Sequence, residues 1–336
     1  MNRYDYVRPD TIADAIAALN SPGACALAGG TNLVDLMKYN VAAPECVVDI
    51  NRLPLKSIEI SDHELRVGAL VSNSELAWHP DIRARWPLLS SAILAGASPQ
   101  LRNAATSGGN LLQRTRCYYF YDPATACNKR APGSGCSAIG GVNRIHAILG
   151  ASDQCIAVHP SDMCVALAAL DATVEVEGPQ GRRTILFADF HRLPGDAPDQ
   201  DNTLKMGELI TSIAIPDPHV GIHHTYLKSR DRLSYAFALV SVAAVLRIED
   251  GIIQDARLAL GGVAHKPWRD FDVEQSLRGQ AAETNAFDAA ARRILRDAKG
   301  QGENDFKIDL AHRAIVRALE QAAAGTPQDQ TDKSIQ

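Results

Sequence analysis

Two glycine pairs far apart in the chain are the residues of this sequence best suited to hold an anion. Gly29-Gly30 follows a short apolar run and precedes Thr31-Asn32, and Gly108-Gly109 stands between Thr106-Ser107 and Asn110. A Gly-Gly step lacks both Cβ atoms, so its backbone N–H groups can approach phosphate oxygens. A helix that begins just after such a step adds partial positive charge. Either pair alone could be a structural tight turn, but two matched copies favour one large anionic ligand.

Neither pair has the G-x-G-x-x-G spacing, so a Rossmann-type dinucleotide site is not predicted.

Four of the seven cysteines form a second group with chemical potential. They fall in one stretch of the chain and are Cys117, Cys127, Cys136 and Cys155. No C-x-x-C pair is present, which argues against an ordinary zinc ribbon, whereas four thiolates can ligate a [4Fe–4S] cube. Free thiols, a disulfide pair and a zinc site remain open alternatives. Cys25, Cys46 and Cys164 lie among apolar neighbours, and we expect them to be small buried hydrophobes.

The same stretch is basic although the whole chain has a net charge of −5. Against Asp122 alone stand five cations, Arg114, Arg116, Lys129, Arg130 and Arg144. This excess would compensate an anionic cluster, and it predicts lowered pKa values for the thiols.

Two further positions could contact a cofactor. Lys228, in the charged segment Tyr226–Arg232, could face the edge of a flavin ring, or the segment could be a solvated strand end. Asp162 could accept a ribose or ribityl hydroxyl, or it could cap the helix after Pro160. The ten histidines form no metal-binding or catalytic motif, so no residue is assigned as catalytic.

The elements that position these residues are of mixed type. The first fifty residues read as helix, strand, glycine turn, helix and strand, a small α/β unit. Further strands are predicted at 65–69, 173–177, 209–215, 236–248 and 253–263, and helices at 87–95, 163–170, 281–299 and 310–319. Periodicity disappears from about Gln113 to Gln154, and a loop this long needs a staple to be ordered in a compact domain.

The overall composition is that of an ordinary globular protein. The chain has 336 residues, 46% of them hydrophobic and 22% charged, which suggests about two domains. It shows no signal peptide, no apolar run long enough to span a membrane, and no basic tract for nucleic acid.

The glycine motifs, extended to 26–33 and 100–111, resemble the two FAD-binding loops in the medium subunit of molybdenum hydroxylases, the xanthine and carbon monoxide dehydrogenase group. The resemblance continues through Val67–Leu70, Pro160–Met163 and Ala259–Ala264. The cysteine stretch is most similar to the FAD and [4Fe–4S] subunit of bacterial aldehyde oxidoreductases, some of them periplasmic. Most members of the family lack these cysteines.

The resemblance implies a mixed α+β and α/β fold. An FAD-binding domain of the vanillyl-alcohol-oxidase type would span 1–218, with subdomains 1–58 and 59–218 and a cluster-bearing loop at 113–158. A C-terminal α/β domain with a small antiparallel sheet would span 222–325, and 326–336 would be a flexible tail.

The resemblance also implies ligand contacts. Contacts to the FAD pyrophosphate would come from Leu27, Ala28, Gly29, Gly30, Thr31, Asn32 and Leu33. Contacts to the second phosphate and ribityl side would come from Thr106, Ser107, Gly109 and Asn110. Asp162 and Lys228 would be further FAD contacts, and the four clustered cysteines would hold the cube.

The implied function is electron transfer within a heterotrimer. A large subunit with the molybdenum cofactor would oxidise an aldehyde, a small subunit would carry [2Fe–2S] clusters, and the FAD of this chain would pass electrons to an external acceptor. Two rival functions are a stand-alone flavin-dependent oxidase and a zinc-stapled binding module without enzymatic activity. The complex would lie in the periplasm, exported on a partner's signal, or in the cytoplasm.

Overall fold

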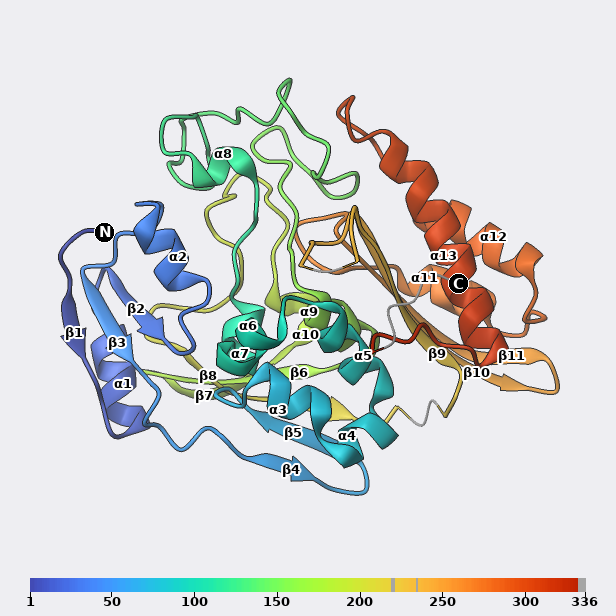
Figure 1. Cartoon of the computed structure of the whole chain (residues 1–336), viewed down its shortest axis with the longest axis horizontal. Coiled ribbons are helices and arrows are strands. Elements are labelled where there is room, and N and C mark those ends of the chain that lie inside the picture. The colour runs from blue at the N-terminus through green and yellow to red at the C-terminus, as the bar shows by residue number, and fades with distance from the viewer. Residues whose placement is uncertain (219–220, 234, 332–336) are drawn as a thin grey trace.

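Three β-sheets with helices between and around them make up the protein (Figure 1). The structure is a computed structural model that describes residues 1–218, 221–233 and 235–331. The sheets lie one after another across the molecule, and the segment around α8 projects above them. This mixed architecture confirms the predicted fold class.

The N-terminal sheet is parallel and has the order β1-β3-β2. Its elements are β1 (Asp5–Val7), α1 (Ile12–Leu19), β2 (Ala24–Leu27), α2 (Leu33–Lys38) and β3 (Cys46–Asp49). Thr11 caps α1, since its hydroxyl accepts a hydrogen bond from the Asp14 N–H. α1 packs its apolar face on β2 and β3, as the helical spacing of its apolar residues predicts.

The central sheet is antiparallel and has the order β4-β5-β8-β6-β7. Its strands are β4 (Ile58–Ile60), β5 (Glu64–Gly68), β6 (Thr173–Gly178), β7 (Gly181–Leu186) and β8 (Leu209–Pro216). The helices of this part are α3 (Asn73–Trp78), α4 (Pro80–Arg85), α5 (Pro87–Ala95), α6 (Pro99–Ala104), α7 (Ser107–Leu111), α9 (Asp162–Ala169) and α10 (Phe187–Phe190). The largest hydrophobic core joins this sheet to α5 and α9.

The C-terminal sheet is antiparallel and has the order β12-β11-β10-β9. Its elements are β9 (His224–Ser229), β10 (Val240–Glu249), β11 (Ile252–Gly261), β12 (Trp268–Arg269), α11 (Phe271–Leu277), α12 (Thr284–Ile294) and α13 (Phe306–Ala324). One face of β10 packs in the core with α13, and the other packs in the core with α9. Burial on both faces explains why this strand is a continuous apolar run and does not alternate.

Three predicted elements differ from the observed ones. The strand expected from Ala236 begins at Val240, because Ala236–Leu239 line a cavity and only Leu239 among them donates a backbone hydrogen bond to β9, at Ser229. The helix expected from Ala281 begins at Thr284, since Ala281 pairs with Ile252. The segment around the second glycine pair folds as the two short helices α6 and α7, and both glycines lie in α7.

The loop 113–158 contains one short helix, α8 (Tyr118–Tyr121), and is otherwise irregular, as predicted. The described part of the tail differs from the expected flexible segment. The Gln330 side chain is buried and donates to the Tyr226 carbonyl over 3.0 Å, and the Gln328 N–H donates to the Thr225 hydroxyl. The rest of the predicted tail, 332–336, lies outside the described residues.

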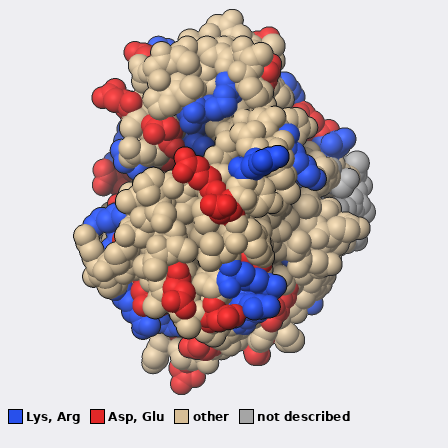
Figure 2. Space-filling model, turned by 90° about the vertical axis from the view of Figure 1, so that its left-hand side faces the viewer, with Lys and Arg blue, Asp and Glu red and all other residues tan. Residues whose placement is uncertain are grey.

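None of the helices in the described part of the chain has the length and apolar character needed to span a bilayer. Acidic and basic side chains are interspersed over the face seen in Figure 2, which is the face on the side of the N-terminal sheet. No continuous basic surface is present on that face.

Candidate cofactor site

Both glycine segments line one cavity of about 640 Å³. Each of the three sheets, or a segment next to it, contributes residues to the lining of the cavity. Examples are Gly29 after β2, Ile210 of β8 and Lys228 of β9. This volume falls in the range of small-molecule and cofactor sites. The predicted contacts that line it are Ala28, Gly29, Gly30, Thr31, Asn32, Leu33, Thr106, Gly109, Asn110, Asp162 and Lys228.

Two predicted contacts lie outside this lining. The Leu27 side chain packs against Gly30, and Ser107 is fully buried with its hydroxyl donating to the Val71 carbonyl. Both therefore support the wall of the cavity from behind.

Glycine is required at position 29 because another part of the chain approaches its backbone closely. A Cβ there would lie 1.9 Å from the carbonyl oxygen of Ala104, at the end of α6. Gly108 is similar, since a Cβ there would lie 2.9 Å from the Cβ of Ala69. The first glycine segment thus packs directly on the backbone that leads into the second.

The first segment presents free backbone donors to the cavity. In the described part of the chain, no residue accepts a hydrogen bond from the N–H groups of Gly29 to Leu33. Gly30 has a φ of +70°, which turns the backbone between β2 and α2. The Asn32 side-chain carbonyl accepts from the Arg114 N–H over 2.9 Å, while its buried amide nitrogen has no partner. A run of unpaired N–H groups on such a turn is an anion-binding nest.

The second segment does not repeat this chemistry, contrary to the prediction. The N–H groups of Ser107 and Gly108 donate to Val71 and Ala69 over 2.9 Å, and that of Gly109 donates to the Thr106 hydroxyl. Its backbone donors are therefore used to fix α7 on β5. What it offers a ligand is the Asn110 amide nitrogen, since the Asn110 oxygen accepts from Ser161 and Gln113.

Asp162 and Lys228 form a buried ion pair beside the cavity, with 2.8 Å between their charged atoms. The helix cap is Ser161, whose hydroxyl accepts from the Cys164 N–H, so the capping role considered for Asp162 is wrong. Lys228 is only 7% exposed, so the solvated strand end does not describe this side chain, although Asp231 and Arg232 at the end of the same segment are exposed. Tyr226 also donates to Asp162, and burial together with this carboxylate raises the tyrosine pKa well above its usual value.

Arg116 is a site residue that the sequence did not single out. It lines the cavity, and its guanidinium lies 5.2 Å from the ring centre of Phe237. Burial lowers the pKa of Arg116, an effect that Tyr121 and Asp35 partly offset, and Arg116 forms no salt bridge within the described ranges. Its only sequence signal was membership of the basic stretch.

The four clustered cysteines meet in one small hydrophobic cluster. Cys117, Cys127 and Cys155 are buried, Cys136 is half-buried, and Cys127 pairs with Cys136 through the backbone. All seven cysteines of the chain are free thiols. His146, whose pKa burial lowers to about 4, lies with its Nε2 3.1 Å from the Cys117 sulfur. The direction of this hydrogen bond follows from the protonation state: the Cys117 thiol can donate to Nε2, whereas a metal-bound thiolate would accept from Nε2–H.

The predicted lowering of the thiol pKa values is not observed. Burial raises the pKa of Cys117 to about 12 and that of Cys155 to about 11, and Lys129 only partly offsets the effect at Cys155. The reason is that most of the local cations already have acceptors. Arg114 and Lys129 share Asp201, and Arg144 pairs with Asp231 over 2.7 Å. A bound metal would itself supply the charge that ionises the thiols.

The cysteine sulfurs are not gathered as closely as the ligands of a single zinc ion. Among the residues that the structure describes, no three of these sulfurs lie within 4.8 Å of one another. Tetrahedral zinc with bonds of about 2.3 Å brings its sulfurs to about 3.8 Å. A cube holds each thiolate on a different iron, so its ligands stand farther apart.

The comparisons with known proteins agree with this geometry. Residues 2–218 match the family described as the FAD binding domain in molybdopterin dehydrogenase, and 224–322 match the CO dehydrogenase flavoprotein C-terminal domain. This chain belongs to that family. It is the FAD-binding subunit of an oxidoreductase of the molybdenum hydroxylase group.

Two curated relatives span nearly the whole chain. The aldehyde oxidoreductase FAD-binding subunit PaoB of Escherichia coli is 49% identical and covers 96% of this chain and 99% of its own. The carbon monoxide dehydrogenase medium chain of Afipia carboxidovorans is 27% identical over 96% of this chain and 97% of its own.

A solved carbon monoxide dehydrogenase from Hydrogenophaga pseudoflava matches with a TM-score of 0.76 and 27% identity, covering 96% of this chain and 98% of that one. The predicted family and FAD are thereby confirmed. The free amides after β2 and the two packed glycine segments fit an FAD diphosphate.

Proposed function

We propose that this chain is the FAD and [4Fe–4S] electron-transfer subunit of a heterotrimeric molybdenum aldehyde oxidoreductase. One observation carries the proposal: the FAD cavity and the cysteine cluster are neighbours. A second cavity, of about 360 Å³, shares Arg116, Ser161 and Phe237 with the first and is also lined by Cys117. Two redox groups in these places would be close enough to exchange electrons through Arg116 and its neighbours.

When bound, FAD supplies the ability to take up electron pairs and release single electrons. The chain holds its diphosphate with the amides of Gly29 to Leu33 and with the Asn110 side chain. The ion pair between Asp162 and Lys228 has no net charge. It therefore holds the wall of the cavity in position and does not neutralise the ligand. Arg116 and Arg102 line the cavity and form no salt bridge in the described residues, so both would neutralise the ligand's negative charge.

A [4Fe–4S] cluster is supported by the number, burial and separation of the four thiols. The hydrogen bond from His146 to the Cys117 sulfur would raise the potential of such a cluster, because it stabilises the added electron. The zinc-stapled alternative fits less well, since the sulfurs do not converge on one ion.

A stand-alone flavin oxidase would need a substrate domain of its own. Here the C-terminal sheet is covered by α13 on one face and by α9 on the other, so it offers little room for one. The relative with 49% identity is named as a subunit of an aldehyde oxidoreductase. We therefore assign aldehyde oxidation to a partner with the molybdenum cofactor, which delivers electrons through a [2Fe–2S] partner to this FAD and on to an external acceptor.

We propose that the assembled complex lies in the periplasm, carried there on a partner's export signal, or in the cytoplasm. Fractionation of the native host distinguishes these two placements.

The central test is the composition of the purified chain. We expect flavin absorbance, a broad iron–sulfur shoulder and about four irons per chain. Cys136→Ser should lose the iron and keep the flavin, while Cys46→Ser, a cysteine outside the cluster, should keep both. Zinc in place of iron, or turnover of an aldehyde by the chain alone, would contradict the proposal.

A further inference from the structure

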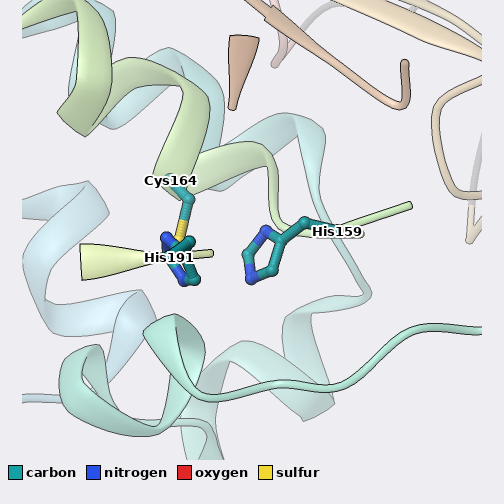
Figure 3. A group of neighbouring side chains, drawn as sticks. All are labelled: His159, Cys164 and His191. Carbon is teal, nitrogen blue, oxygen red and sulfur yellow. The ribbon is translucent and has the colours of Figure 1, made fainter. Parts of the chain in front are cut away.

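Three side chains outside both proposed sites bring metal-ligand atoms together. They are His159, Cys164 and His191, and one ligand atom of each lies within 4.8 Å of the other two. Figure 3 shows the Cys164 sulfur at the His191 ring, with the His159 ring next to these two side chains. His159 follows the cysteine loop, Cys164 is in the first turn of α9, and His191 directly follows α10. The chain thus converges on this point from three separate segments.

The ring nitrogens of both histidines are short of hydrogen-bond partners. Among the residues that the structure describes, neither nitrogen of His159 has one, although both atoms are buried. His191 is 3% exposed, and its buried Nδ1 also lacks a partner within the described ranges, while its Nε2 lies 2.8 Å from the Leu111 carbonyl oxygen. Buried polar atoms without partners are rare and destabilising. A ligand bound to these ring nitrogens would remove that cost.

The bond from His191 to Leu111 has the form found behind metal-bound histidines. A neutral imidazole that donates Nε2–H to a backbone carbonyl leaves the Nδ1 lone pair free to bind a metal, and the carbonyl fixes the ring orientation. Burial lowers the pKa of His191 to about 4 and that of His159 well below its usual value, so both rings are neutral and able to coordinate.

Cys164 supplies the third ligand from a favourable position. Its N–H donates to the Ser161 hydroxyl at the start of α9, which fixes the backbone that carries the sulfur. Burial raises the pKa of this thiol to about 12, so the proton stays until a cation replaces it. Metal binding therefore forms a metal–sulfur bond and releases one proton to solvent.

We propose that His159, Cys164 and His191 bind a borderline divalent transition-metal ion of the zinc class. Two imidazoles and one thiolate suit zinc and not magnesium or calcium, which prefer oxygen ligands. Tetrahedral zinc needs its ligand atoms about 3.3 to 3.8 Å apart, so inward shifts on the order of 1 Å complete the site. The 360 Å³ cavity, which His159 also lines, admits a water molecule as the fourth ligand.

The site would tie the end of the cysteine loop to α9 and to the segment after α10. Through Leu111 it also touches α7, which carries the second glycine segment of the FAD cavity. Its role is structural, and its three ligands belong neither to the four-cysteine cluster nor to the lining of the FAD cavity.

The test measures zinc, iron and flavin together in the full-length chain after exposure to Zn²⁺ and gel filtration. We expect roughly one tightly held zinc per chain. Co²⁺ in its place should give a thiolate-to-metal charge-transfer band. Cys164→Ser and His159→Gln should each lose the zinc and that band while iron and flavin stay. Cys46→Ser is the matched control and should retain all three.

Wild-type protein without bound zinc, or zinc that survives both His159→Gln and Cys164→Ser, would overturn the proposal. If Cys164→Ser fails to fold, His159→Gln alone decides, because His159 is only half-buried. Zinc lost with Cys136→Ser and retained in Cys164→Ser would place the ion at the four cysteines, and this result would contradict the metal site and the iron–sulfur cluster separately.

Discussion

At the residue scale, the shape of the cavity depends on the lack of a side chain at Gly29. Gly29 lies so close to the Ala104 carbonyl that no other residue fits without moving the backbone of one segment. The free N–H groups that follow it keep their position only if this contact is kept.

We expect Gly29→Ala to weaken FAD binding more than tenfold and to reduce the free energy of unfolding by about 1–3 kcal/mol, the usual range for overpacking. Flavin titration and thermal unfolding measure the two effects. Gly251→Ala is the control: it adds a Cβ in open space, so only its positive φ, about 1 kcal/mol, is at stake. Equal flavin affinity in both variants would show that the contact with Ala104 is unimportant.

Arg116 should contribute to FAD affinity because it is a half-buried cation that lines the cavity and forms no salt bridge in the described residues. Replacing it by glutamine removes a charge-assisted interaction worth about 1.5–3 kcal/mol, so the Kd for FAD should rise at least tenfold. Fluorescence titration of the flavin-free protein measures this. Arg83→Gln, at a cation that does not line the cavity, should leave the Kd unchanged.

At the scale of elements, one carboxylate fastens the cysteine loop to the rest of the protein. Asp201 lies outside the loop and accepts from Lys129 and Arg114, the latter over 2.6 Å. Burial alone would raise the pKa of Asp201, but the two cations outweigh it and hold the pKa at about 2.

This pKa predicts an acid-sensitive loop. Because the folded pKa lies below the ordinary value of 3.8, the interaction is fully present above about pH 4 and is lost as the pH falls towards 2. The stabilisation is about 2 kcal/mol. Asp201→Asn should therefore expose the loop to limited proteolysis at neutral pH, as acid does in the wild type. If the variant is as resistant as the wild type at pH 7, another contact fastens the loop.

The ion pair of Asp162 and Lys228 joins α9 to β9, and Lys228 also donates to the Ala95 carbonyl at the end of α5. Lys228→Met would leave a buried carboxylate unpaired and should destabilise the protein by about 3–5 kcal/mol. The double variant Asp162→Asn with Lys228→Met should recover much of this loss. Thermal unfolding of the wild type, Asp162→Asn, Lys228→Met and the double variant gives the coupling energy, and purely additive effects would disprove the coupling.

At the scale of the whole molecule, the cavity lies where the surroundings of all three sheets meet. A ligand there contacts every unit, so FAD should stabilise the protein as a whole. At a free concentration one hundred times its Kd, we expect about 2.7 kcal/mol of additional stability. Calorimetry with and without FAD measures it, and two separate transitions of which only one moves would show that the units unfold independently.

Sequence alone determined the two glycine segments, the four-cysteine group and most regular elements, because each depends on local chemistry. Gly30 makes the turn between β2 and α2, and Thr11 caps α1. The bounds of α2, β3 and α5 agree with those predicted from apolar spacing to within a few residues. The resemblance of these ordered motifs also identified the family.

Only the tertiary structure decided what the segments do to one another. It showed that Gly29 packs on Ala104, that Asp162 pairs with Lys228 and that Asp201 takes up two cations of the basic stretch. It also brought His159, Cys164 and His191 together. These contacts join residues from separate segments, and no local pattern encodes them, because burial and pairing depend on where the folded chain brings each side chain.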